Sequence, residues 1–353
     1  MFRLAFTIIL LLPVFFISRD IRAEPSPIRD ISAYRQAAEA GNADAQYSLG
    51  LMYQNGAGVL KSVTEAARWY GMAAAQGDAR AQYALATLYH TGQGMKKDTQ
   101  KAAEYYEKAA SQGHVLAQRY LGGLYTYGDG VPQNIEAAVK WWTKAAEQDD
   151  ARAAYFLGQL YANKKYAGYD EQEAVKWYEK AAQLGDADAQ FALARAYKKG
   201  RGVPTQDVHR ALDLYRQAGA QGHVEAQFLL GKNLMFYPGR GEEAVAWLIQ
   251  AAKQGHLEAQ YWVAEAYAEG KLTKRNDVQA QYWISVADIS RKQETPEHLR
   301  RAITNLYAKI NMQISDSDKK EAKLLFLEYM GVMDAGRRQF FCRHSPDQCP
   351  GLR

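Results

Sequence analysis

The stretch GNADAQY at residues 41–47 returns as GDARAQY at residues 77–83, and these two copies of one heptapeptide lie 36 residues apart. Weaker copies begin at Gly113, Asp149, Gly185, Gly222 and Gly255. The steps between successive copies are 36, 36, 36, 36, 37 and 33 residues. Self-similarity with a period in this range is typical of helical repeat arrays. The sequence therefore predicts one array of seven repeats over residues 41–291.

The first half of each repeat has the spacing of an α-helix. In the second repeat, small residues occur at Ala81 and Ala86, with Leu85 between them and Tyr89 one turn further on. Spacings of four, five and eight residues place these side chains on one side of a helix. The small residues would let a second helix approach closely, and the large ones would fill the remaining space.

The second half predicts a turn and another helix. A Gly-x-Gly pair such as Gly92 and Gly94 follows the first helix, where glycine favours a left-handed C-terminal cap. An aromatic pair and an Ala-Ala pair recur along the second helix, as at Tyr105–Tyr106 and Ala109–Ala110. Residues of N-cap type stand 21 positions after five of the repeat origins. They are Ser62, Asp98, Asn134, Asp170 and Asn276.

These motifs resemble the Sel-one-like repeat family, a longer relative of the tetratricopeptide repeats, over residues 34–291. The resemblance implies an all-α fold, an α/α right-handed superhelical solenoid of seven helix-turn-helix repeats with helical caps. It also implies a protein-interaction scaffold whose first helices line a concave face. Many bacterial members are exported and act in envelope regulation, polysaccharide secretion or host contact. The fourth repeat departs from the Gly-x-Gly pattern at residues 163–166, and the sixth has a shortened loop at residues 236–239.

The ends of the chain predict caps and an export signal. Residues 1–23 have a basic start at Arg3 and an apolar run over residues 4–17, which is typical of a cleaved signal peptide. The alternative is an uncleaved anchor. Residues 24–40 resemble a lone second helix, and residues 292–333 predict two capping helices, over 296–311 and 318–333, with Asp316, Ser317 and Asp318 as cap candidates. We therefore expect a periplasmic or secreted bacterial protein with no transmembrane anchor after signal removal.

The tail over residues 334–353 contains Cys342 and Cys349, the only two cysteines in the sequence. A close pair in an exported chain favours a disulfide over a metal site.

A search for chemistry predicts neither an enzyme nor a cofactor. His114, His223 and His256 occupy the same position in three repeats, so we expect them at equivalent helix starts and not in a metal site. Ser317 and Lys320 match an S-x-x-K nucleophile motif, but the partner motifs are missing and Ser317 is better explained as a helix cap. The net charge of +5, which falls to +3 without residues 1–23, gives no reason to expect nucleic acid.

A second stripe on the first helices, at positions 3, 7, 10 and 14 after each origin, predicts where a partner binds. From the third repeat onward it becomes aromatic and basic, which would suit an acidic, partly apolar segment. The alternative is that Phe156, Leu229 and Trp262 pack between repeats. The predicted partner-binding residues are Tyr120, Tyr127, Arg152, Phe156, Arg195, Lys199, Lys232, Phe236 and Trp262.

The sequence thus favours an exported scaffold that binds an envelope or host protein. Two other functions stay open. One is an envelope hydrolase acting on a peptidoglycan-like or β-lactam substrate, which only the resemblance suggests. The other is a carbohydrate-binding module, because aromatic side chains can stack on sugars.

Overall fold

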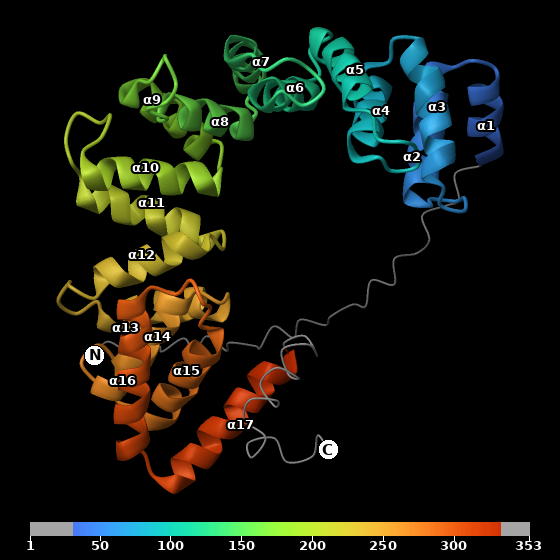
Figure 1. Ribbon diagram of the computed structural model, residues 1–353. Coiled ribbons are helices and arrows are strands. Elements are labelled where there is room, and N and C mark those ends of the chain that lie inside the picture. Colours follow the sequence, from blue (N-terminus) through green and yellow to red (C-terminus); the bar gives the residue numbers. More distant parts are fainter. Residues whose placement is uncertain (1–30, 333–353) are drawn as a thin grey trace, which may run out of the picture. The chain divides into compact units, whose positions relative to one another are not determined.

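The computed structural model describes residues 31–332, which form seventeen α-helices and no strand (Figure 1). Helix bounds are as follows: α1 Ile31–Glu39, α2 Ala43–Asn55, α3 Val63–Ala75, α4 Ala79–Thr91, α5 Thr99–Ser111, α6 Val115–Tyr127, α7 Ile135–Glu147, α8 Ala151–Tyr161, α9 Glu171–Gln183, α10 Ala187–Lys199, α11 Val208–Ala220, α12 Val224–Leu234, α13 Gly241–Lys253, α14 Leu257–Glu269, α15 Asp277–Ser290, α16 Glu297–Gln313 and α17 Asp316–Val332. The predicted all-α fold of helix pairs is confirmed. The predicted signal peptide, Cys342 and Cys349 lie outside the described residues.

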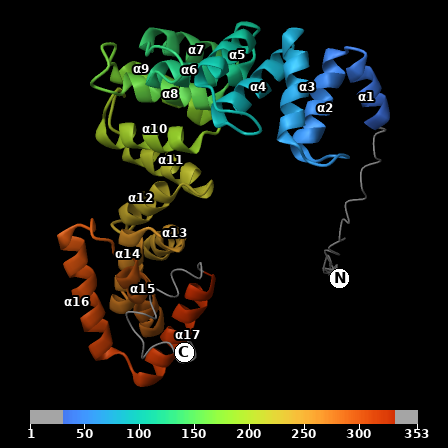
Figure 2. The same ribbon diagram turned by 45° about the vertical axis from the view of Figure 1, so that its right-hand side comes forward.

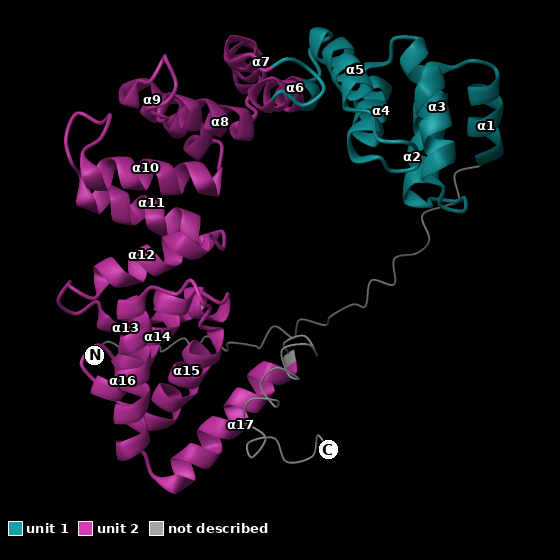
Figure 3. Cartoon of the chain, in the orientation of Figure 1, with its two compact units in different colours: residues 1–117, 128–132 teal, residues 118–127, 133–353 magenta. Residues whose placement is uncertain are grey.

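The helices fall into two compact units (Figure 3). Unit 1 comprises the described residues up to Ala117 together with residues 128–132. Unit 2 comprises residues 118–127 and the described residues from Gln133 onward. The boundary between the units lies within the third repeat, and all nine predicted partner-binding residues belong to unit 2.

Short-range capping determines where the helices begin and end. The side chains of all five predicted second-helix caps accept a backbone N–H from the first turn; Asp98, for example, accepts from Lys101 N at 3.0 Å. Gly92 follows α4 with φ of 73° and donates its N–H to the carbonyl of Leu88. A left-handed conformation of this kind is easily adopted by glycine. Local capping contacts therefore determine where the two helices of a repeat begin and end.

Small residues on the first helices allow the second helices to pack closely, as the sequence predicted. A Cβ atom added to Gly122 of α6 would lie 2.5 Å from the ring of Trp142 on α7. Gly50 and Gly158 are in the same situation against Tyr70 and Tyr178. These contacts explain why a helix-destabilising residue stands inside each of these helices.

A row of buried glutamines, each paired with an exposed glutamine, recurs along the array, a feature that the sequence analysis missed. Gln82 donates from Nε2 to the carbonyl of Ala74 at 3.3 Å and accepts from Gln112 Nε2 at 2.8 Å. Four further pairs of this kind recur along the array. In the fourth repeat both positions are apolar, as Ala154 and Leu184. The fourth repeat therefore holds no buried amide that would need such a partner.

The last two helices close unit 2 by packing against α15 (Figures 1 and 2). Ile303 on α16 and Phe326 and Met330 on α17 are buried in one cluster with residues of α13, α14 and α15. The expectation that Ser317 caps α17 was wrong. The cap is Ser315, whose Oγ accepts from Asp318 N at 3.1 Å, while Ser317 lies exposed within the first turn.

Candidate functional site

The first helices begin at residues whose side chains accept backbone N–H groups. His114, His223 and His256 serve as these caps, and Nδ1 of each ring accepts at 3.1–3.2 Å from the backbone N–H three residues later. The three histidines therefore occupy equivalent helix starts, as predicted. Within residues 31–332 no group of three histidine, cysteine or carboxylate side chains could hold a metal ion.

Each of these imidazole rings also contacts the preceding repeat. His114 stacks on Tyr83 with ring centroids 4.6 Å apart, and His223 and His256 stack on Phe191 and Phe228 at 4.4 and 4.2 Å. Burial lowers the pKa of His114 below its usual value. A neutral ring is what the cap needs, because a protonated Nδ1 cannot accept a hydrogen bond.

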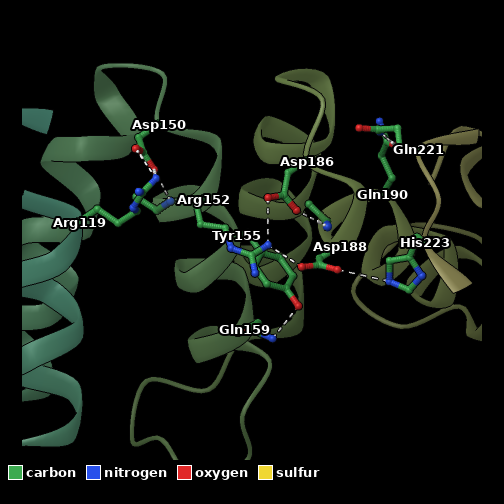
Figure 4. A network of polar contacts seen from close by, with 12 residues as sticks. Arg119, Asp150, Arg152, Tyr155, Gln159, Asp186, Asp188, Gln190, Gln221 and His223 are labelled. Carbon is green, nitrogen blue, oxygen red and sulfur yellow. Dashed lines mark hydrogen bonds and ion pairs between the residues drawn. The ribbon is translucent and has the colours of Figure 1, made fainter. Parts of the chain in front are cut away.

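A network of ion pairs connects the caps of unit 2 to the preceding repeats (Figure 4). Arg119 on α6 lies 3.0 Å from Asp150, the cap of α8. Arg152 on α8 lies 3.3 Å from Asp186, the cap of α10, and also pairs with Asp188. Asp188 in turn lies 3.4 Å from Nε2 of His223, the cap of α12. The charged side chains near the starts of these first helices therefore pair with one another within the array.

Two of the predicted partner-binding cations have such internal partners. Arg152 belongs to the network above, and its guanidinium also lies over the ring of Phe156, 5.4 Å from the centroid. The ammonium of Lys232 lies 2.7 Å from Glu258 and 5.9 Å from the centroid of the Trp262 ring. A partner would have to compete with these carboxylates for both side chains.

Phe156 and Trp262, together with Leu229, are partly buried between repeats. Phe156 lies 5.4 Å from Trp142, centroid to centroid. Leu229 and Trp262 pack against the apolar cluster of the last repeats. Their surroundings match the packing alternative that the sequence left open.

The other five predicted residues are accessible, and we call them the first-helix surface. Tyr120 and Tyr127 on α6 are 39% and 84% exposed, and Phe236, which follows α12, is 81% exposed. Arg195 and Lys199 on α10 are also exposed. Aromatic and cationic side chains of this kind suit macromolecular recognition.

Sequence reasoning did not find two grooves that are lined mainly, but not only, by second helices. One, of about 540 Å³, lies beside Gly219, Trp247 and Gln254, and another, of about 770 Å³, is lined by Tyr267, Tyr282 and Tyr329 among others. A signal for the first was present in the small residues of α11 and α13. The hydrolase alternative gains nothing from the structure, because Ser317 is an exposed residue in the first turn of a capping helix.

None of the helices within residues 31–332 is both long and apolar enough to cross a membrane.

Comparison with known proteins identifies the repeats. The model of the Sel1 repeat, the family that the sequence resembles, matches seven consecutive segments: residues 43–78, 79–114, 115–150, 151–186, 187–223, 224–256 and 257–287. No curated protein matches the chain.

Two solved structures share the fold. A Sel1 repeat protein from Oxalobacter formigenes is 33% identical with a TM-score of 0.58, and the match covers 64% of this chain and 95% of that one. A protective antigen present in uropathogenic Escherichia coli strains, displaying an SLR fold, is 23% identical with a TM-score of 0.50, and the match covers 85% and 86%. With seven matched segments spanning residues 43–287, the chain belongs to the Sel1 repeat family.

Proposed function

We propose that this protein is an exported scaffold of the bacterial envelope that binds a protein partner, from the envelope or from a host, through the first-helix surface of unit 2. Sel1 repeats are typical of protein–protein interaction, which supports the general function. The apolar run over residues 4–17 supports export.

The observation that carries the proposal is the exposure of two large aromatic side chains at equivalent places in the array. Tyr127 stands 14 positions after the origin of the third repeat and Phe236 stands 14 positions after that of the sixth, and both are more than four-fifths exposed. The repeat-position aromatics Tyr70 and Tyr106, by contrast, are fully buried. Burial in a complex would remove the unfavourable contact of these exposed rings with water, at about 25 cal/mol per Å² of apolar surface.

Affinity capture with a matched pair of variants tests this proposal. Immobilised protein should retain a specific protein from envelope or host extract in a fixed stoichiometry. Tyr127→Asp with Phe236→Asp should abolish retention, because a charge placed in an apolar contact must be desolvated without a partner.

The control replaces two other exposed apolar residues of unit 2, in Met312→Asp with Leu324→Asp. The control should retain the same protein as the unmodified chain. Equal loss in both variants, or retention by both, would contradict the assignment of the binding surface.

A further inference from the structure

The C-terminal ends of α10 and α12 concentrate positive charge where a hydrogen bond joins them. Lys198 of α10 donates from Nζ to Oδ1 of Asn233 on α12 at 2.8 Å, which ties the two helix ends together. Burial lowers the pKa of Lys198, and the neighbouring cations Lys232 and Lys199 lower it further. The ammonium groups of Lys199 and Lys232 thus each repel that of Lys198.

Most of this charge has no carboxylate partner within residues 31–332. Among residues 31–332 the structure gives an ion pair for Lys232, with Glu258, but none for Lys198, Lys199 or Arg195. The charge of Arg195 helps to lower the pKa of Glu225, but that carboxylate is already hydrogen-bonded to His256 at 3.2 Å. This contrasts with Arg80, Arg119 and Arg152, the other arginines on first helices, which are all paired.

The negative end of the helix dipole explains only part of this cluster. Lysines in the last turn of a helix are stabilised by the dipole, so the positions of Lys198 and Lys199 have a local explanation. Arg195 lies outside that last turn, and the dipole of α10 does not account for the approach of Lys232 from the neighbouring helix.

An exposed aromatic residue stands three positions after Asn233, the residue to which Lys198 donates. Phe236 follows the end of α12 and stands at the repeat position that Lys199 occupies on α10. A binding site for an acidic side chain next to an apolar one would need such a combination: unpaired cations for the carboxylates and an accessible ring beside them.

We propose that the partner contributes an acidic segment with an aromatic residue next to its carboxylates, an inference that rests on the proposed function. The carboxylates bind Arg195, Lys198 and Lys199, and the aromatic residue packs on Phe236. Arg152 and Lys232 stay in their internal ion pairs and take no part. The segment is therefore recognised at the ends of α10 and α12, over two repeats of unit 2.

The test measures binding of labelled synthetic peptides to the purified protein by fluorescence anisotropy. One peptide carries three glutamates beside a phenylalanine, a second has glutamines in place of the glutamates, and a third has alanine in place of the phenylalanine. The first should bind most tightly, and its affinity should fall as salt is raised. Each of the other two should bind at least about fivefold more weakly, since each lacks one of the two recognised groups.

Variants of the protein separate a local site from the effect of net charge. Arg195→Glu with Lys199→Glu should weaken the first peptide by at least about tenfold. The control, Lys140→Glu with Lys320→Glu, makes the same change in net charge at exposed residues of α7 and α17 and should change the affinity by less than about twofold. Equal weakening by both double variants would overturn the proposal, as would a glutamine peptide that binds as tightly as the glutamate peptide.

Two further arms separate this inference from its alternatives. If an acidic polysaccharide without aromatic groups bound as tightly as the first peptide, at the same residues, the ligand would be a polyanion and the proposal would be wrong. If a captured protein partner were not displaced by an excess of the first peptide, the inference would fail while the proposed function stood. Conversely, binding of the peptide with no protein partner captured would support the site and remove the proposed function.

Discussion

Two adjacent glycines of α6 should respond to the same substitution in opposite ways. Gly122 faces α7, and a Cβ atom there would lie 2.5 Å from the Trp142 ring. Gly123 is the next residue, and a Cβ atom there would meet nothing within 4 Å. Both lie inside the helix, so alanine would bring the same intrinsic gain at each, about 0.8–1.0 kcal/mol.

The difference between the free energies of unfolding of the two variants therefore measures the cost of crowding the contact between α6 and α7. Trp142 cannot easily move away, because Nε1 donates to the carbonyl of Arg119 at 3.0 Å and the ring packs against Phe156. Overpacking of this kind costs about 1–3 kcal/mol. We expect Gly123→Ala to raise the free energy of unfolding by up to about 1 kcal/mol and Gly122→Ala to lower it by up to about 2 kcal/mol.

Urea unfolding gives the two free energies, and amide hydrogen exchange in α6 and α7 localises the effect, because a repeat array can open unit by unit. The reasoning would be refuted if the two variants had free energies of unfolding equal within about 0.5 kcal/mol. Equality would mean that Trp142 gives way without cost, and that small residues do not set the spacing of the helices.

Three other predictions concern two single substitutions and one cysteine pair. His114→Asn should keep the cap of α6, as Asn42 does for α2, and should flatten the fall in Tm on acidification. The pKa of His114 is lower in the folded protein than in the unfolded chain, so its contribution to stability is complete above about pH 6.5, the unfolded pKa, and is lost as the pH falls through the folded pKa. A variant whose Tm falls with acid as steeply as that of the unmodified protein would contradict this. Ser290→Gln should supply a donor to Gln260 Oε1, which is buried without a hydrogen bond within residues 31–332, and should add about 1 kcal/mol in urea unfolding; no gain would show that the glutamine row cannot be extended there. Intact-mass measurement without reductant should find Cys342 and Cys349 joined in the purified protein, and two free thiols would rule the disulfide out.

Local patterns in the sequence were enough to predict the helices. The caps at Ser62 and Asn134 and the left-handed Gly92 depend on residues within one turn of each other, so their outcome did not need the tertiary structure. The sequence did not identify Ser315 as the cap of α17, because three residues of cap type follow it directly. Only the backbone shows which of the four residues precedes the first turn.

Long-range pairings were harder to predict, because they join residues about one repeat apart. Arg152 has its partners at Asp186 and Asp188, so its charge is used inside the array although the stripe pattern had marked it for a partner. The glutamine row had a visible signal, since Gln82 and Gln112 stand at positions that recur along the array. Superposing one repeat on the next would have revealed both.

Site-specific photocrosslinking in living cells tests most directly whether a partner binds the first-helix surface. A photoreactive amino acid would replace Tyr127, Lys199 or Phe236, and, as controls, Lys140, Met312 or Lys320, all exposed residues of unit 2. The proposed function predicts an adduct with one and the same protein from the first three positions and none from the controls. The same adduct from both sets, or no adduct from the first set, would contradict it.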